Sequence, residues 1–124
     1  MNKAIARKLL TQERARLERL RSGVFDELGD ASEREVVGDL SGSDQHPADA
    51  GSERFEREKT VSIMANLDVE IHEVELALHR LDEGSYGRCE ICRRPIGEPR
   101  LRARPAARYC ISDQASMERA VRTA

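Results

Sequence analysis

All three cysteines of this 124-residue chain lie within a window of 22 residues. Cys89 and Cys92 are separated by two residues, and Cys110 follows after seventeen more, with Asp113 where a second pair would have its partner cysteine. This spacing is typical of a two-knuckle zinc ribbon, in which each knuckle brings two ligands to one Zn²⁺ ion from a tight turn. The sequence therefore predicts one zinc ion held by Cys89, Cys92, Cys110 and Asp113.

Asp113 has two interpretations. A carboxylate oxygen is an accepted zinc ligand, although it is less selective for zinc than a thiolate. Aspartate is also a preferred helix N-cap, and Asp113 precedes a short helical pattern at residues 114–122. A knuckle packed without metal and a redox or mixed-ligand site are further alternatives to zinc binding. An odd number of cysteines argues against a disulfide framework.

Composition limits the class of protein. Charged residues make up 35% of the chain and aromatic residues 3%, with no tryptophan, which favours long helices over a compact globule. No stretch approaches the roughly 18 apolar residues of a membrane span, and residues 1–10 lack the apolar core of a secretion signal. Reduced cysteines at metal spacing then indicate a cytoplasmic protein. Because the histidines are dispersed, we expect no catalytic site and no enzyme activity.

Residues 60–81 carry an apolar seam that steps by four and three residues, which is the period of a coiled-coil helix. Its members are Thr60, Met64, Leu67, Ile71, Val74, Leu78 and Leu81. Asp49 or Ser52 is a suitable residue to start this helix, and Gly84 is well placed to stop it. A stripe of this length needs a partner that shields it from water.

The partner is expected in residues 3–28, where a less regular stripe consists of Ile5, Leu9, Leu10, Leu17, Leu20, Val24 and Leu28. Two helices joined by the Gly-, Ser- and Asp-rich residues 29–51 most simply fold back on each other. The alternative is a homodimer through the second seam. We predict a mainly α monomer: a long antiparallel coiled-coil hairpin at residues 1–83 with its tip at 29–51, then a small zinc ribbon and a short C-terminal helix at 84–124.

The charges are distributed unevenly along the chain. Residues 26–49 hold eight acids against one base, whereas residues 88–108 hold seven arginines against two acids. Part of the arginine cluster has a local role, because three thiolates and one carboxylate around Zn²⁺ leave a formal charge of about −2. The acidic segment would be repelled by nucleic acid, so a protein partner is the better expectation for the tip.

Three parts of the chain, in this order, resemble the DksA/TraR family of bacterial transcription regulators. They are residues 44–59 (DQHPADAGSERFEREK), residues 77–92 (ALHRLDEGSYGRCEIC), and the ribbon residues 95–97, 100–101, 103–105 and 109–111. The resemblance implies a regulator that binds bacterial RNA polymerase without contacting promoter DNA. Its coiled coil would enter the secondary channel of the polymerase, and the tip acids Asp44 and Asp49 would approach the active centre.

The chain departs from the family pattern at the tip. Asp49 is retained, but His46 and Gly51 replace an acid and an alanine of the family motif, and Asp44 is two residues out of register with the missing acid.

The resemblance also bears on the arginines. It makes Arg100, Arg102 and Arg104 candidate basic contacts. Some family members form a site for the alarmone ppGpp with the polymerase, and Arg104 matches one of its basic positions. Glu73 and Gln114 stand where lysines are expected, so we predict no ppGpp response. The alternative functions are a small zinc-ribbon module that contacts nucleic acid through its arginines, and a thiol redox sensor.

Overall fold

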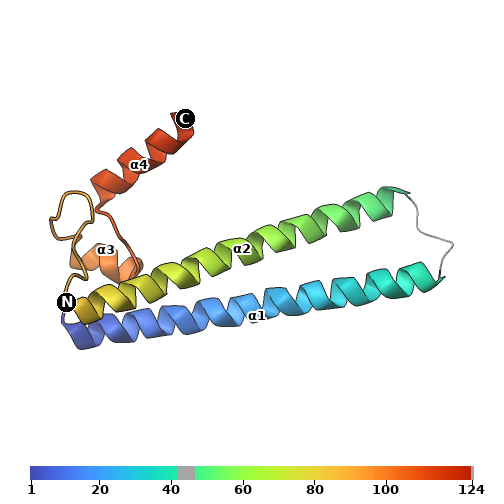
Figure 1. Ribbon diagram of the computed structural model, residues 1–124, viewed down its shortest axis with the longest axis horizontal. Coiled ribbons are helices and arrows are strands. Elements are labelled where there is room, and N and C mark those ends of the chain that lie inside the picture. The colour runs from blue at the N-terminus through green and yellow to red at the C-terminus, as the bar shows by residue number, and fades with distance from the viewer. Residues whose placement is uncertain (42–46, 124) are drawn as a thin grey trace. The chain divides into compact units, whose positions relative to one another are not determined.

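The computed structural model describes the backbone of residues 1–41 and 47–123, and the side chains of residues 1–29 and 51–123. Its helices are α1 (Lys3–Ser41), α2 (Pro47–Glu83), α3 (Glu98–Ala103) and α4 (Ile111–Thr123) (Figure 1). The β-structure of the described residues is a single bridge between Arg88 and Pro95. The predicted mainly helical fold, a hairpin followed by a zinc-finger region and a short helix, is confirmed. No helix in the described part of the chain is long and apolar enough to cross a membrane.

The chain divides into two compact units. The first unit contains residues 1–15 and 72–124, so that it joins the start of α1, the end of α2 and the cysteine region. The second unit spans residues 16–71 and includes the remainder of both long helices. The predicted boundary at residue 84 between a coiled coil and a zinc module stays a prediction.

The seam predicted on α2 is confirmed by burial. Leu67, Val74 and Leu81 are buried, and the other four seam residues are half-buried. On α1, Leu10 and Leu17 are buried as predicted, but Ile5 and Leu20 are exposed and the prediction was wrong for them. The 3.6-residue period places these two side chains beside the seam rather than in it, and the small Ala6 occupies the buried position one turn before Leu10.

Ion pairs at heptad spacing join α1 to α2. Within the first unit they are Arg7–Asp82 at 2.6 Å and Arg14–Glu75 at 3.3 Å, and within the second unit Arg21–Asp68 at 2.5 Å. The arginines are seven residues apart on α1, and so are the acids on α2. Because all six side chains are exposed, each pair contributes only about 0.2–1 kcal/mol. Their main effect is to specify the antiparallel register, as flanking charges do in coiled coils.

The end of α2 has the glycine-containing geometry that its sequence predicts. Gly84 has a φ of 85°, and its N–H donates to the carbonyl of Leu81 at 3.3 Å. The N–H of Ser85 donates to the carbonyl of Arg80 at 2.9 Å. These two hydrogen bonds form a Schellman motif, which requires a residue with positive φ and therefore favours glycine.

The connector predicted at residues 29–51 is shorter in the structure. Helix α1 continues to Ser41, and α2 begins at Pro47 rather than at Asp49 or Ser52. A proline suits the first turn of a helix because its missing N–H would have no partner there. Gly29 does not interrupt α1, since one glycine inside a helix costs only about 1 kcal/mol. Asp44 lies outside the described residues.

Candidate metal centre

The first knuckle is a tight turn that follows α2. The N–H of Cys89 donates to the carbonyl of Arg94 at 2.9 Å, and the N–H of Arg93 donates to the carbonyl of Cys89 at 3.0 Å. Arg93 has a φ of 65°, a left-handed conformation that is uncommon outside glycine. The turn therefore folds back over Cys89 and leaves the Cys92 side chain exposed at its far end.

A small apolar core supports the two knuckles. Cys89, Ile96 and Leu101 are buried together, and four half-buried residues pack against them: Tyr86, Ala107, Tyr109 and Cys110. The hydroxyl of Tyr86 donates to the carbonyl of Pro105 at 2.7 Å, and burial raises the pKa of this phenol. One of the predicted ligands, Cys89, is thus also part of the core.

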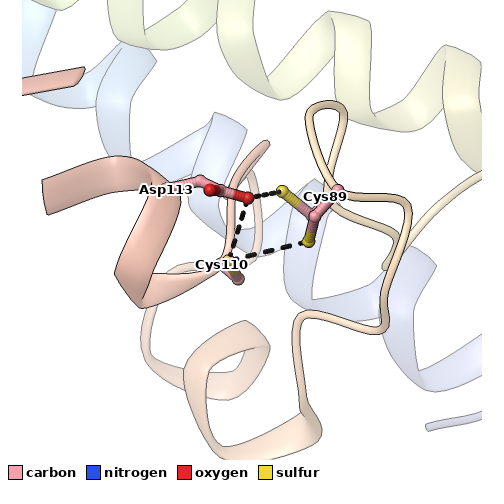
Figure 2. Close-up of side chains that lie close together, drawn as sticks. Cys89, Cys110 and Asp113 are labelled. Atoms are coloured by element: carbon pink, nitrogen blue, oxygen red, sulfur yellow. Dashed lines mark hydrogen bonds between the residues drawn. The ribbon is translucent and has the colours of Figure 1, made fainter. Parts of the chain in front are cut away.

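The second knuckle leads directly into a helix. Helix α4 begins at Ile111, and the N–H of Gln114 donates to the carbonyl of Cys110 at 2.9 Å. Asp113 is therefore the third residue of α4, and Cys110 immediately precedes the helix. The interpretation of Asp113 as the N-cap is wrong, because the N-cap residue precedes the first helical residue. The carboxylate of Asp113 points instead toward the cysteines (Figure 2).

The four predicted ligands converge in the structure. The thiols of Cys89 and Cys110 donate to Asp113 Oδ2 at 3.0 and 3.3 Å (Figure 2). The sulfurs of Cys92 and Cys110 are 3.9 Å apart. All four ligand atoms lie within 4.8 Å of one another. Bond lengths of about 2.3 Å to sulfur and about 2.0–2.2 Å to oxygen give edges of about 3.5–3.8 Å in a tetrahedral zinc site. The four ligand atoms are therefore close enough to surround one ion after small side-chain movements.

The electrostatics of the cluster also suit a cation. Hydrogen bonds from Cys89, Cys92 and Cys110 lower the pKa of the Asp113 carboxyl. The backbone N–H of Arg94 lowers the pKa of Cys92, but the neighbouring Asp113 and burial outweigh it and raise this pKa to about 11. Burial raises the pKa of Cys89, but hydrogen bonds from nearby backbone N–H groups outweigh it, and the net shift is downward. A bound metal ion deprotonates its thiol ligands whatever their starting pKa.

The three arginines predicted as basic contacts have different environments. Arg100 Nε donates to the carbonyl of Tyr109 at 3.0 Å, which ties the chain before the second knuckle to α3. Arg102 forms an ion pair with Glu98 at 2.8 Å. Arg104 is exposed at the end of α3. Two of the three guanidinium groups therefore have partners within the same module.

An ionic chain near the knuckles was not predicted from the sequence. It consists of Arg80, Glu90, Arg108 and Glu73. Glu90 Oε2 accepts from Arg108 Nη2 at 2.8 Å and from Arg108 Nε at 3.1 Å. Arg80 lies 3.7 Å from the other oxygen of Glu90, and Glu73 lies 3.5 Å from Arg108. The sequence held one signal for this contact. Glu90 lies inside the first knuckle and Arg108 lies two residues before Cys110, so a shared metal site would bring these opposite charges close together.

Of the two acids predicted to act at the tip, the structure places one. Asp49 is the third residue of α2, at the end of that helix from which residues 42–46 lead back to α1. Asp44 falls among residues 42–46, which the structure does not describe.

Comparison with known proteins identifies similar chains. Residues 84–119 match the model of the prokaryotic dksA/traR C4-type zinc finger. The structure of transcription factor DksA2 from Pseudomonas aeruginosa aligns with a TM-score of 0.76 and 28% identity, over 97% of this chain and 85% of that one. Two curated relatives are similar over shorter parts of their own length. Uncharacterized protein YteA of Bacillus subtilis is 30% identical over 109 residues, which are 85% of this chain and 46% of YteA.

The second curated relative is the RNA polymerase-binding transcription factor DksA of Caulobacter vibrioides. It is 45% identical over 49 residues, which are 40% of this chain and 34% of the relative. The chain thus spans less than half the length of either curated relative. The solved structure, by contrast, aligns with both the long helices and the cysteine region, because it covers nearly the whole chain.

Proposed function

Because this chain belongs to the DksA/TraR family of C4-type zinc-finger proteins, we propose that it regulates transcription by binding RNA polymerase. The observation that carries the proposal is the alignment with a transcription factor over 97% of the chain. The similarity therefore includes the hairpin, which is the part that would contact the polymerase. A relative named as RNA polymerase-binding supports the same partner.

The hairpin would enter the secondary channel and bring its acids to the active centre. Asp49 lies near the start of α2, and residues 26–49 hold eight acids against one base. Carboxylate oxygens are the ligands that Mg²⁺ prefers, so an acidic tip suits a site that handles Mg²⁺ and phosphate. The same acids repel DNA, which favours a mode of action without promoter contact. We propose Asp49 and Asp44 as the residues that act there.

The cysteine region would hold one Zn²⁺ ion through Cys89, Cys92, Cys110 and Asp113. The ion would cross-link the two knuckles and contribute folding free energy, which is the role of a closed four-ligand site without an open position for substrate. Cys89 is buried in the core of the module, so this ligand is placed by packing as well as by the metal. The metal is therefore structural in this proposal.

Two side chains support the predicted lack of a ppGpp response. Glu73 lies 3.5 Å from Arg108 and neutralises part of the positive charge at the base of the hairpin. Gln114 donates to Glu118 at 3.1 Å within α4. An acid and a hydrogen-bonded amide replace two cations that a pyrophosphate group would need. We propose that this chain acts without the alarmone.

A thiol redox sensor is the second candidate function. The sulfurs of Cys92 and Cys110 are 3.9 Å apart, and Cys92 is exposed. Peroxide oxidation of these two thiols to a disulfide would remove two zinc ligands. Counting free thiols before and after peroxide treatment tests this function. The nucleic-acid alternative has less support, because Arg102 and Arg108 are already paired with acids of the same module.

Co-purification with core RNA polymerase tests the proposal. The tagged full-length chain would be isolated from a bacterial lysate treated with nuclease, and zinc would be measured in the same sample. We expect the polymerase subunits to be retained after nuclease treatment together with about one zinc per chain. Retention only before nuclease treatment would support the nucleic-acid alternative and contradict the proposal.

A further inference from the structure

The two knuckles are joined by a contact that contains no cysteine. Glu90 lies inside the first knuckle, and its N–H donates to the carbonyl of Arg108 at 3.0 Å. The side chains of the same residues meet again, since Arg108 donates through Nη2 and Nε to one carboxylate oxygen of Glu90 at 2.8 and 3.1 Å. Three hydrogen bonds therefore connect the segments that carry Cys89 and Cys110.

Longer contacts connect this pair to α2. Arg80 lies 3.7 Å from Glu90, and Glu73 lies 3.5 Å from Arg108. Glu73 Oε2 and Arg80 Nη2 are buried without a hydrogen-bond partner. Charged atoms withdrawn from water need nearby charges of opposite sign, because water no longer screens or solvates them. The charges on α2 therefore favour a conformation in which Glu90 and Arg108 stay in place between them.

We propose that Glu90 and Arg108 are positioning residues for the metal, which hold the two knuckles at ligand distance before the ion binds. The inference rests on the proposed zinc site. A forked arginine–carboxylate contact fixes both distance and orientation, unlike a single hydrogen bond. Ligands that are already assembled lose less conformational freedom when the metal arrives, so the same four donors bind it more tightly.

A simple charge effect makes a different prediction. Glu90 and Arg108 carry opposite charges, so a charge effect alone would make their replacement by glutamine change zinc affinity in opposite directions. Positioning requires both residues, so both Gln variants should lose affinity. Comparing the signs of the two changes therefore separates the two explanations.

The chain contains a matched control pair. Arg102 donates to one oxygen of Glu98 through Nη2 at 2.8 Å and Nε at 3.2 Å, which is nearly the geometry of the Arg108–Glu90 contact. Both control residues lie within one turn of α3, so their contact joins no knuckles. Substitutions there change the same charges in the same module without changing the proposed connection.

The experiment measures the zinc dissociation constant of the full-length chain by competition with a chromophoric chelator near pH 7. The variants are Glu90→Gln, Arg108→Gln, Arg108→Lys and the double variant with Gln at both positions, with Glu98→Gln and Arg102→Gln as controls. We expect each single change at Glu90 or Arg108 to weaken zinc binding by about 10-fold, the lower end of the effect of residues that orient metal ligands. The double variant should be no weaker than the worse single one, because either change breaks the same contact.

The outcomes separate the inference from the site on which it rests. Zinc binding by Glu90→Gln that equals or exceeds wild type overturns the positioning role, and so does an equal loss in the control variants. Failure of the wild-type chain to bind zinc overturns the metal site itself. Circular dichroism verifies that each variant keeps its helices. If the Gln variants do not fold, Arg108→Lys tests the proposal instead, because lysine keeps the positive charge but cannot donate two hydrogen bonds from one planar group. Wild-type zinc affinity in Arg108→Lys contradicts the proposal.

Discussion

The two compact units of the chain differ in how they bury apolar side chains. In the first unit, Leu10 and Val74 are at most 1% exposed, and the cysteine region adds a core of its own. In the second unit, Leu17 and Leu67 are the buried residues among the described side chains. Its exposed large apolar side chains are Leu20, Phe25, Phe55, Val61, Ile63 and Val69.

This difference in burial implies a difference in local stability between the two units. Burial of apolar surface stabilises a fold by roughly 25 cal/mol per Å², so the first unit holds most of the stabilising area. Among its described side chains the second unit has few that are buried, and regions of that kind open at lower free energy. Exposed large apolar side chains do not distinguish the units, because each unit has six of them among the described residues. We propose that the second unit is the part that enters the polymerase.

Loss of the metal should have the largest effect, and that effect should be confined to the cysteine region of the first unit. Structural zinc contributes on the order of 10 kcal/mol in small zinc domains, so Cys89→Ser should unfold residues 84–124 while the hairpin stays helical. Far-UV circular dichroism and amide NMR signals on the full-length chain measure both parts. Treating wild type with a chelator should give the same result. A single transition in which all helical signal is lost together would contradict the separation.

Truncating one leucine in each unit should give the next largest contrast. Leu10→Ala should destabilise the chain by about 2–5 kcal/mol, because Leu10 is fully buried. Leu20→Ala should change stability by no more than about 0.5 kcal/mol, since Leu20 is exposed. Urea unfolding followed by helical signal compares the two variants. Equal losses would mean that Leu20 is covered in solution, for instance by a second copy of the chain.

Substitutions at Asp113 should change how strongly the cysteine region retains zinc, because Asp113 supplies the oxygen ligand of the candidate site. Asp113→Asn and Asp113→Ala should both lose zinc to a chelator that leaves wild type loaded, because neither keeps the carboxylate ligand. Asp113→Cys should retain zinc more strongly, since thiolate is the softer and preferred ligand. Metal content after matched dialysis is the measurement. Full zinc in both the Asn and Ala variants would remove Asp113 from the ligand set.

A smaller effect is expected at the ion pairs that specify the register. The hydrogen bond and charge of Arg7 hold the pKa of Asp82 below its ordinary value of 3.8. Because the folded pKa is the lower one, the stabilisation by this pair is present above pH 3.8 and is lost as the pH falls through the folded value. Arg7→Gln should raise the Asp82 pKa toward 3.8, as an NMR titration of its carboxyl would detect. An unchanged pKa would mean that the pair does not form in solution.

Regular spacing explains which parts of this fold were predictable. The seam of α2 follows the coiled-coil period, so its buried residues were predictable from the sequence. The end of α2 was predictable because glycine readily adopts the positive φ that Gly84 has. The heptad spacing of Arg7, Arg14 and Arg21 was an available signal for the register that went unused. Residues 29–41 lack an apolar period, and their helix was therefore missed.

The candidate metal centre was predictable to a similar extent. Its four ligands were named from spacing alone, because knuckle geometry depends on a short local turn. The N-cap interpretation of Asp113 failed because α4 begins two residues earlier, and helix boundaries are the least certain part of a sequence pattern. The Glu90–Arg108 contact was missed because it joins residues 18 apart in the chain with no periodic relation.

The central claim is that the hairpin carries acids to the polymerase active centre, and Asp49→Asn tests it most directly. Transcription by purified RNA polymerase would be measured with wild-type chain and with this variant, at promoters that wild type regulates. We expect equal binding to the polymerase and unchanged folding, because asparagine removes the charge of Asp49 and keeps the size of its side chain. The variant should lose most of the regulatory effect, because it lacks the charge of Asp49. Regulation equal to wild type by the bound variant would contradict it.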